Sequence, residues 1–215
     1  MVNRFLILLF LVLNLTYQAQ SDSVMVTEQI GFKEGIYLTH QDFRKNNPIT
    51  KEQIKTKLDK EQLDFYFKVA SNEKLEYTIG NATYTIATKT IWGLEQNKTL
   101  FVNFNGAFFR VPVFGAISYF AGVVEVTGYY TGVYDPMFGM GGNRTVKTKE
   151  LNEFIMNYYI GKVLSFNMTD LDAMLSNDAD VYKQFKSLSR RKRKKQATRF
   201  IRMYNQNHPV YYLNK

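Results

Sequence analysis

Between residues 74 and 165 the chain alternates runs of aromatic and β-branched residues with tight-turn signals. EYTI and TYTIATKTI flank Gly80-Asn81, and TLFVNF and AFFRVPVF flank Asn105-Gly106. Such pairs supply the positive φ angles that two-residue hairpin turns require. ISYFAG, VVEVTGYYTGVY and NEFIMNYY continue the pattern, and KVLSF follows after Ile160-Gly161. We therefore predict an antiparallel β-meander at the centre, packed against helices or closed into a small barrel.

Helical patterns bracket these strands, so the predicted fold class is α+β. THQDFRKNNP offers Thr39 as an N-cap, with Asp42 in the first turn, and Pro48 prevents the helix from continuing. TKEQIKTKL has a capping-box pattern from Thr50 to Gln53, which predicts a second short helix. Later segments TDLDAML, DADVYKQFKSL and ATRFIRMY predict C-terminal helices, with N-cap Thr169 and apolar stripes of Val181, Phe185 and Leu188 and of Ala197, Phe200, Ile201 and Tyr204.

The first residues have the three regions of a secretory signal peptide. Arg4 is followed by an apolar stretch, Phe5 to Leu13, and then by a polar region in which Ala19 is the small residue near the cleavage point. The apolar stretch is shorter than the roughly 20 residues that span a bilayer. A buried helix or an uncleaved anchor is the alternative. We expect residues 1–20 to be the signal peptide, 21–186 one α+β domain, and 187–215 a basic C-terminal helix and tail.

The chain contains no cysteine, which excludes a disulfide framework and a lipid-modified cysteine. A domain of this length buries enough apolar surface to fold without disulfides. Export without cysteine fits a bacterial envelope better than an animal extracellular module. We therefore expect an exported protein, either periplasmic or secreted, with no transmembrane span once the signal peptide is removed.

The basic charge of the chain is concentrated near its C-terminus. Lys and Arg number 28 against 19 Asp and Glu, a net charge of +9, yet residues 183–202 contain ten of the basic residues and no acid. Six of them are consecutive, and they are the predicted anion- or surface-binding residues: Arg190, Arg191, Lys192, Arg193, Lys194 and Lys195. The alternative is that the run is only a solvated helical face, or a solvated break or turn at the junction between two helices. No aromatic residue interrupts the run for base stacking, so no nucleic acid is expected as a partner. The expected partners are an anionic lipid headgroup, an envelope glycolipid or an acidic protein.

Three stretches resemble a family of uncharacterised exported proteins common in Bacteroidota. They are GIYLTHQDFRKNNPI, KTIWGLEQNKTLFVNF and YNQNHPVYY, and their order and spacing are also similar. The family has no established activity, so the resemblance implies no functional residues. It implies a Gram-negative envelope setting and structural roles for Trp92 and Gly93.

No arrangement of residues identifies a catalytic, cofactor or metal site. His40 and His208 are far apart and lack partners at ligand spacing, so capping and surface roles are expected. DLDAMLSNDAD is rich in acids but lacks the glycine and glutamate of a calcium-binding EF-hand loop, and helix-dipole roles explain its acids. FGMGGNRT lacks the residues of a phosphate-binding loop. Its apolar members, Met137, Phe138 and Met140, make it a candidate partner loop.

Two classes of function remain. The first is a non-catalytic envelope protein that binds a partner and uses its cationic C-terminal helix to dock on an anionic surface. The alternative is a carboxylate-based hydrolase that acts on envelope glycans. A cleft holding two close carboxylates is the feature that distinguishes the second class from the first.

Overall fold

The computed structural model describes residues 23–26, 31–131 and 143–213. Helices and antiparallel strands form an α+β fold in these ranges, as the sequence predicts. The described strands make separate open sheets, so the barrel that we considered does not form. The expected signal peptide, residues 1–20, and the candidate partner loop with Met137, Phe138 and Met140 lie outside the described residues.

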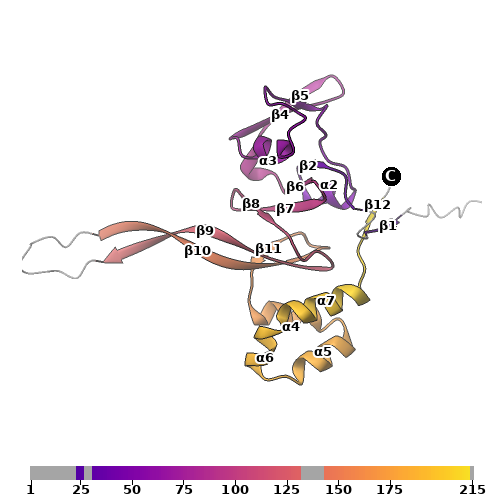
Figure 1. Ribbon diagram of the computed structural model, residues 1–215, viewed down its shortest axis with the longest axis vertical. Coiled ribbons are helices and arrows are strands. Elements are labelled where there is room, and N and C mark those ends of the chain that lie inside the picture. The colour runs from indigo at the N-terminus through magenta and orange to yellow at the C-terminus, as the bar shows by residue number, and fades with distance from the viewer. Residues whose placement is uncertain (1–22, 27–30, 132–142, 214–215) are drawn as a thin grey trace, which may run out of the picture.

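Two sheets build the N-terminal half of the body (Figure 1). One has the order β2-β6-β7-β8 and the other the order β3-β4-β5. Helices α2 (His40–Arg44) and α3 (Phe65–Ala70) and the 3-10 turn η1 (Thr88–Thr90) lie between these strands in the chain. The strands are β2 (Gly35–Tyr37), β3 (Ile54–Lys55), β4 (Lys74–Ile79), β5 (Ala82–Ala87), β6 (Gly93–Gln96), β7 (Thr99–Phe104) and β8 (Ala107–Arg110).

A third sheet, β9-β10-β11, continues into a long two-stranded ribbon that projects from the body (Figure 1). Strand β9 (Ile117–Thr131) pairs along its whole length with β10 (Asn143–Asn157), so the predicted run ISYFAG and the described part of the next run, residues 123–131, form one strand. Strand β11 (Val163–Ser165) pairs only with the end of β10 nearest the body. The two-stranded sheet of β1 (Ser23–Met25) and β12 (Tyr211–Leu213) joins the N-terminal and C-terminal segments of the body.

The predicted hairpin turns are confirmed. Asn105 and Gly106 have φ angles of 54° and 88°, and they connect Phe104 to its partner Ala107. Gly80 has a φ of 58° between the paired ends of β4 and β5. A further turn between β6 and β7 escaped prediction, because its left-handed residues are Asn97 and Lys98 rather than a pair containing glycine.

One predicted helix is wrong. The Thr50 amide donates to Gln53 Oε1 at 2.9 Å, as a capping box requires, but the chain continues as a turn and then as β3. Ile54 pairs with Tyr77 of β4 and is buried in the core around α3. Sheet pairing and burial therefore override the local capping signal. The predicted cap of α2 is confirmed, since the Asp42 amide donates to Thr39 Oγ1 at 3.1 Å.

Four helices form the C-terminal part of the body. They are α4 (Met168–Leu175), α5 (Ala179–Lys186), α6 (Arg190–Lys195) and α7 (Ala197–Asn207). The N-cap of α4 is Asn167 rather than the expected Thr169, since Asn167 Oδ1 accepts from the Asp170 amide at 2.9 Å. The predicted stripe of α7, Ala197, Phe200, Ile201 and Tyr204, is buried, as are Val181 and Phe185 of α5.

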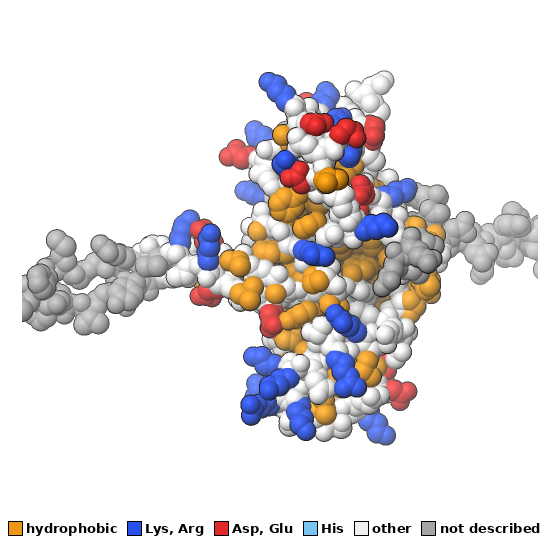
Figure 2. Space-filling model, viewed as in Figure 1, with side chains coloured by type: hydrophobic (Ala, Val, Ile, Leu, Met, Phe, Trp, Pro, Cys, Tyr) orange, Lys and Arg blue, Asp and Glu red, His pale blue; other side chains and the backbone are white. Residues whose placement is uncertain are grey.

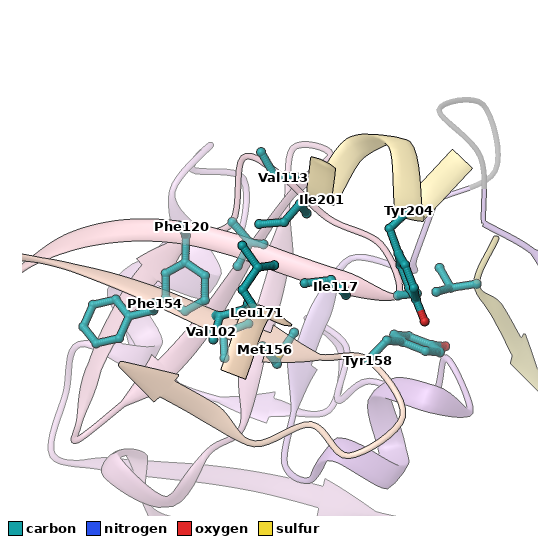
Figure 3. Close-up of a cluster of buried hydrophobic side chains, with 14 of the residues drawn as sticks. Val102, Val113, Ile117, Phe120, Phe154, Met156, Tyr158, Leu171, Ile201 and Tyr204 are labelled. Carbon is teal, nitrogen blue, oxygen red and sulfur yellow. The ribbon is translucent and has the colours of Figure 1, made fainter. Parts of the chain in front are cut away.

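One large hydrophobic cluster joins these helices to the sheets. Ile201 of α7 lies with Ile117 and Phe120 of β9 and with Phe154 and Met156 of β10 (Figure 3). Beyond the apolar contacts, the side chain of Asn205 accepts from the Ile117 amide at 2.9 Å and donates to the Ile117 carbonyl at 2.8 Å. Residues after the predicted boundary at 186 thus share the core of the preceding body. A second, smaller cluster surrounds α3.

Trp92 and Gly93 both have packing roles. The Trp92 ring stacks on Phe43 with a centroid distance of 4.4 Å, and its Nε1 donates to the Gly161 carbonyl at 3.1 Å. A Cβ on Gly93 would lie 2.5 Å from the Phe101 carbonyl oxygen of the neighbouring strand, so a side chain does not fit there. In the described part of the chain, no helix is long and apolar enough to cross a bilayer.

Candidate functional site

The basic run forms a helix of its own, α6, between α5 and α7. None of its six side chains is buried. Figure 2 shows Lys and Arg side chains gathered at the end of the molecule that carries α6. The run is therefore neither an extended break nor a simple turn, and its helical spacing decides which charges lie together.

Four of the six basic side chains line one groove with a volume of about 880 Å³. Positions 190 and 194, and likewise 191 and 195, are one helical turn apart and lie on the same side of α6. None of the ion pairs or side-chain hydrogen bonds found among the described residues involves these four. They are Arg190, Arg191, Lys194 and Lys195.

The rest of the groove lining combines apolar and polar groups from β10, from the segment between β11 and α4, and from the start of α4. Phe166 and Met168 supply apolar surface, Asn167 and Thr169 supply polar side chains, and Glu153 is the one acid in the lining. A groove lined by both basic and apolar side chains suits an amphipathic ligand with an anionic head.

Glu153 is engaged by a neighbour rather than by the basic residues. Its Oε1 accepts a hydrogen bond from the Tyr119 hydroxyl at 2.5 Å. Burial, reinforced by Glu153, raises the pKa of Tyr119 to about 12, so the phenol keeps its proton and donates at neutral pH. The Tyr119 ring also contacts Phe166 edge-on, with a centroid distance of 5.4 Å. These contacts hold Glu153 and Phe166 in place, and Glu153 forms no ion pair with the four cations of α6 in the described structure.

Arg193 has a different role from its neighbours. Its Nη1 lies 3.5 Å from Asp172 Oδ1, and its guanidinium lies over the Phe185 ring at 5.5 Å from the centroid. Asp172 also contacts Lys186 Nζ at 3.2 Å. Arg193 therefore fastens α6 to α4 and α5, whereas exposed Lys192 lines no part of the groove. The sequence prediction treated all six residues alike, and the structure separates them.

The acids of DLDAMLSNDAD have structural roles that do not require calcium. Asp178 caps α5 by accepting from the Val181 amide at 3.0 Å, and this hydrogen bond is the main cause of its lowered pKa. Asp170 and Asp180 lie in the first turns of α4 and α5. Within residues 23–26, 31–131 and 143–213, no group of three or more potential ligands forms a metal site.

Both histidines are engaged in packing contacts. His40 Nε2 lies 2.7 Å from the Tyr158 carbonyl oxygen, and burial lowers its pKa. His208 Nε2 lies 3.2 Å from Asp178 Oδ2 and its ring stacks on Tyr204. His40 thus joins α2 to the end of β10, a tertiary role that its isolated position in the sequence does not reveal.

A second pocket, of about 820 Å³, escaped sequence reasoning. Its lining includes Glu95 of β6, Glu34, Lys98 and Arg110. Glu95 is only 5% exposed, and its Oε2 is buried without a hydrogen-bond partner in the described structure. Burial, with a smaller contribution from Glu34, raises the pKa of Glu95 to about 7. The sequence feature that could have indicated this pocket is the position of Glu95, an acid that lies between the apolar runs TYTIATKTI and TLFVNF of two predicted strands.

Comparison with known proteins adds no family or fold relationship. No family model, curated protein or solved structure matches the chain significantly. The residues and geometry described above are therefore the basis for assigning a function.

Proposed function

We propose that this is an exported, non-catalytic envelope protein that docks on an anionic lipid surface through the groove beside α6. The observation that supports it is the joint placement of Arg190, Arg191, Lys194 and Lys195 along one groove. Phosphate oxygens of lipid headgroups are the complementary ligands for Arg and Lys side chains. Phe166 and Met168 in the same lining give acyl or glycerol carbons an apolar surface.

Folding alone gives no reason for this arrangement. The pairs Arg190–Lys194 and Arg191–Lys195 place like charges one turn apart, which costs a few tenths of a kcal/mol per pair. No acid of the described structure lies within ion-pair distance to offset them. An anionic surface removes this repulsion. Each Lys or Arg near such a surface contributes about 1 kcal/mol, so the four contribute about 4 kcal/mol at low ionic strength.

Vesicle co-sedimentation tests the proposal. The protein without residues 1–20 is mixed with vesicles of phosphatidylcholine alone or of phosphatidylcholine with phosphatidylglycerol. We expect it to sediment with the anionic vesicles only, and binding should weaken as salt increases because screening shortens the range of the charges. Free glycerophosphate at millimolar concentration should compete if the groove recognises the headgroup itself.

A matched pair of variants tests whether vesicle binding depends on where the positive charges lie or only on how many there are. The groove variant changes Arg190, Arg191, Lys194 and Lys195 to Gln and should stay in the supernatant. The control changes four exposed lysines elsewhere, at 57, 74, 89 and 162, to Gln, which removes the same charge. The control should bind like the wild type. Equal loss of binding in both variants would mean that net charge alone attracts the protein to the vesicles, and would overturn the proposal. If the protein bound an acidic protein but no anionic vesicle, the partner would be that protein and not a lipid surface.

The alternative function, a carboxylate-based hydrolase acting on envelope glycans, depends on the second pocket. Glu34 and Glu95 both line it, and an acid with a raised pKa suits a general acid. However, Glu34 Oε1 already accepts from the Asn97 amide at 2.7 Å, and Lys98 and Arg110 share the lining. Release of reducing ends from purified envelope glycan by the wild type, and its loss in Glu95→Gln, would favour this alternative.

A further inference from the structure

The pocket of Glu95 contains charges of both signs that are not paired with one another. Glu34 and Glu95 are its acids, and Lys98 and Arg110 are its bases. None of the ion pairs found in the described ranges includes any of these four residues. Of these four residues only Glu95 is buried, and its Oε2 has no hydrogen-bond partner in the described structure. Buried polar atoms in proteins are ordinarily hydrogen-bonded, so this oxygen is the atom of the pocket that lacks a partner.

Glu95 is held in this position by the sheet. It lies in β6 directly across from Gly35 of β2 and Leu100 of β7. Gly35 has no side chain to cover the carboxylate, and Leu100 lines the same pocket and offers no donor. The unpartnered Oε2 is therefore built into a rigid central strand, 5% exposed, at the wall of the cavity. It can accept a hydrogen bond from a ligand that enters there.

The remaining surface is supplied by loops and strand ends. Lys98 lies in the β6–β7 turn, where its φ of 57° belongs to the left-handed region, and Arg110 is the last residue of β8. Both are exposed. Phe32 and Phe114 are in edge-to-face contact, with a centroid distance of 5.4 Å, and both line the pocket. The cavity thus combines a buried acid, exposed bases and an aromatic wall.

We propose that this pocket binds a small zwitterion that carries a primary ammonium and a carboxylate, such as a short apolar peptide. The ammonium has three donors and satisfies Glu95 Oε2 together with Glu34. The carboxylate pairs with Arg110 and Lys98, for which Arg has a bidentate geometry. Phe32 and Phe114 contact the apolar side chains and favour a nearby cation through their ring faces. A metal ion explains the pocket less well, because the two carboxylates are not joined by a third ligand of the described structure.

Calorimetric titration with leucyl-leucine and two of its derivatives tests this proposal. The N-acetyl derivative lacks the ammonium and the amide derivative lacks the carboxylate. We expect leucyl-leucine to bind the wild type, and each derivative to bind at least about tenfold more weakly, because a buried charge loses its partner. No heat of binding with leucyl-leucine at 10 mM, or equal binding of all three compounds, would overturn the proposal.

Two variants assign each end of the ligand to its residue. In Glu95→Gln, leucyl-leucine should bind about as weakly as its N-acetyl derivative binds the wild type, while the effect of amidation should persist. In Arg110→Gln, leucyl-leucine should bind about as weakly as its amide derivative binds the wild type, while the effect of N-acetylation should persist. Simple loss of folding cannot produce these opposite patterns, and circular dichroism spectra of both variants should match that of the wild type. Binding or cleavage of an envelope oligosaccharide in place of the peptide would assign the pocket to the hydrolase alternative and overturn this inference, whereas vesicle binding through α6 would be unaffected.

Discussion

Replacing Glu95 by Gln should change how the stability of the protein depends on pH. The pKa of this carboxyl is about 7 in the folded protein against an ordinary value of 4.5, with burial as the main cause and Glu34 as the second. Below pH 4.5 the group is protonated in both the folded and the unfolded chain and has no effect. Between pH 4.5 and 7 the unfolded chain ionises first, so the folded protein loses stability as pH rises. Above pH 7 the loss is complete.

The magnitude follows from this difference in pKa. One pKa unit corresponds to about 1.4 kcal/mol, so the full loss is at most about 3.5 kcal/mol. Because the carboxyl lies at the wall of a pocket open to solvent, water screens part of this cost, and we expect about 2 kcal/mol between pH 5 and pH 8. The other titratable or charged side chains nearby are those of Glu34, Tyr37, Tyr66, Lys98 and Arg110. Burial raises the pKa of Tyr37 above its usual range and that of Tyr66 to about 12, so both tyrosines stay neutral throughout.

Urea denaturation at pH 5 and pH 8 measures the effect. The free energy of unfolding of Glu95→Gln, relative to that of the wild type, should be about 2 kcal/mol larger at pH 8 than at pH 5, because the variant does not share the stability loss of the wild type. Taking this difference removes the contributions of all other titrating groups. Glu73→Gln, at an exposed position between α3 and β4, is the matched control and should show the same stability relative to wild type at both pH values. If Glu95→Gln behaved like this control, the carboxyl would not be desolvated and the reasoning would be refuted.

Three further predictions concern the body of the protein. Gly93→Ala should destabilise it by about 2 kcal/mol or more, measured by thermal and urea unfolding, because the new Cβ meets the Phe101 carbonyl oxygen. Asn205→Ala should cost about 2 kcal/mol in the same assay, since both backbone groups of Ile117 lose their side-chain partner, and an unchanged stability would show that water replaces it. Limited proteolysis should not divide the chain into two stable halves within residues 75–165, and such halves would contradict a single α+β domain.

Local chemistry made several elements predictable from the sequence alone. The hairpin at Asn105-Gly106, the cap of α2 at Thr39 and the buried stripe of α7 each depend on residues a few positions apart. Their determinants are backbone conformation, a side-chain cap and the period of the helix, and these are written in short segments. The α+β class followed from the same signals.

Tertiary contacts decided the rest. The capping pattern at Thr50 fails to form a helix because Ile54 pairs with β4, a segment more than twenty residues away. The groove exists because the fold brings α6 to the same cavity as the start of α4 and Glu153 of β10, and the sequence cannot tell that Arg193 pairs instead with Asp172. In the sequence nothing distinguishes Glu95 from other acids near strands. In the structure, pairing with β2 and β7 buries it beside a cavity. Short-range signals specify elements, whereas burial and charge at a site depend on which distant segments the core brings together.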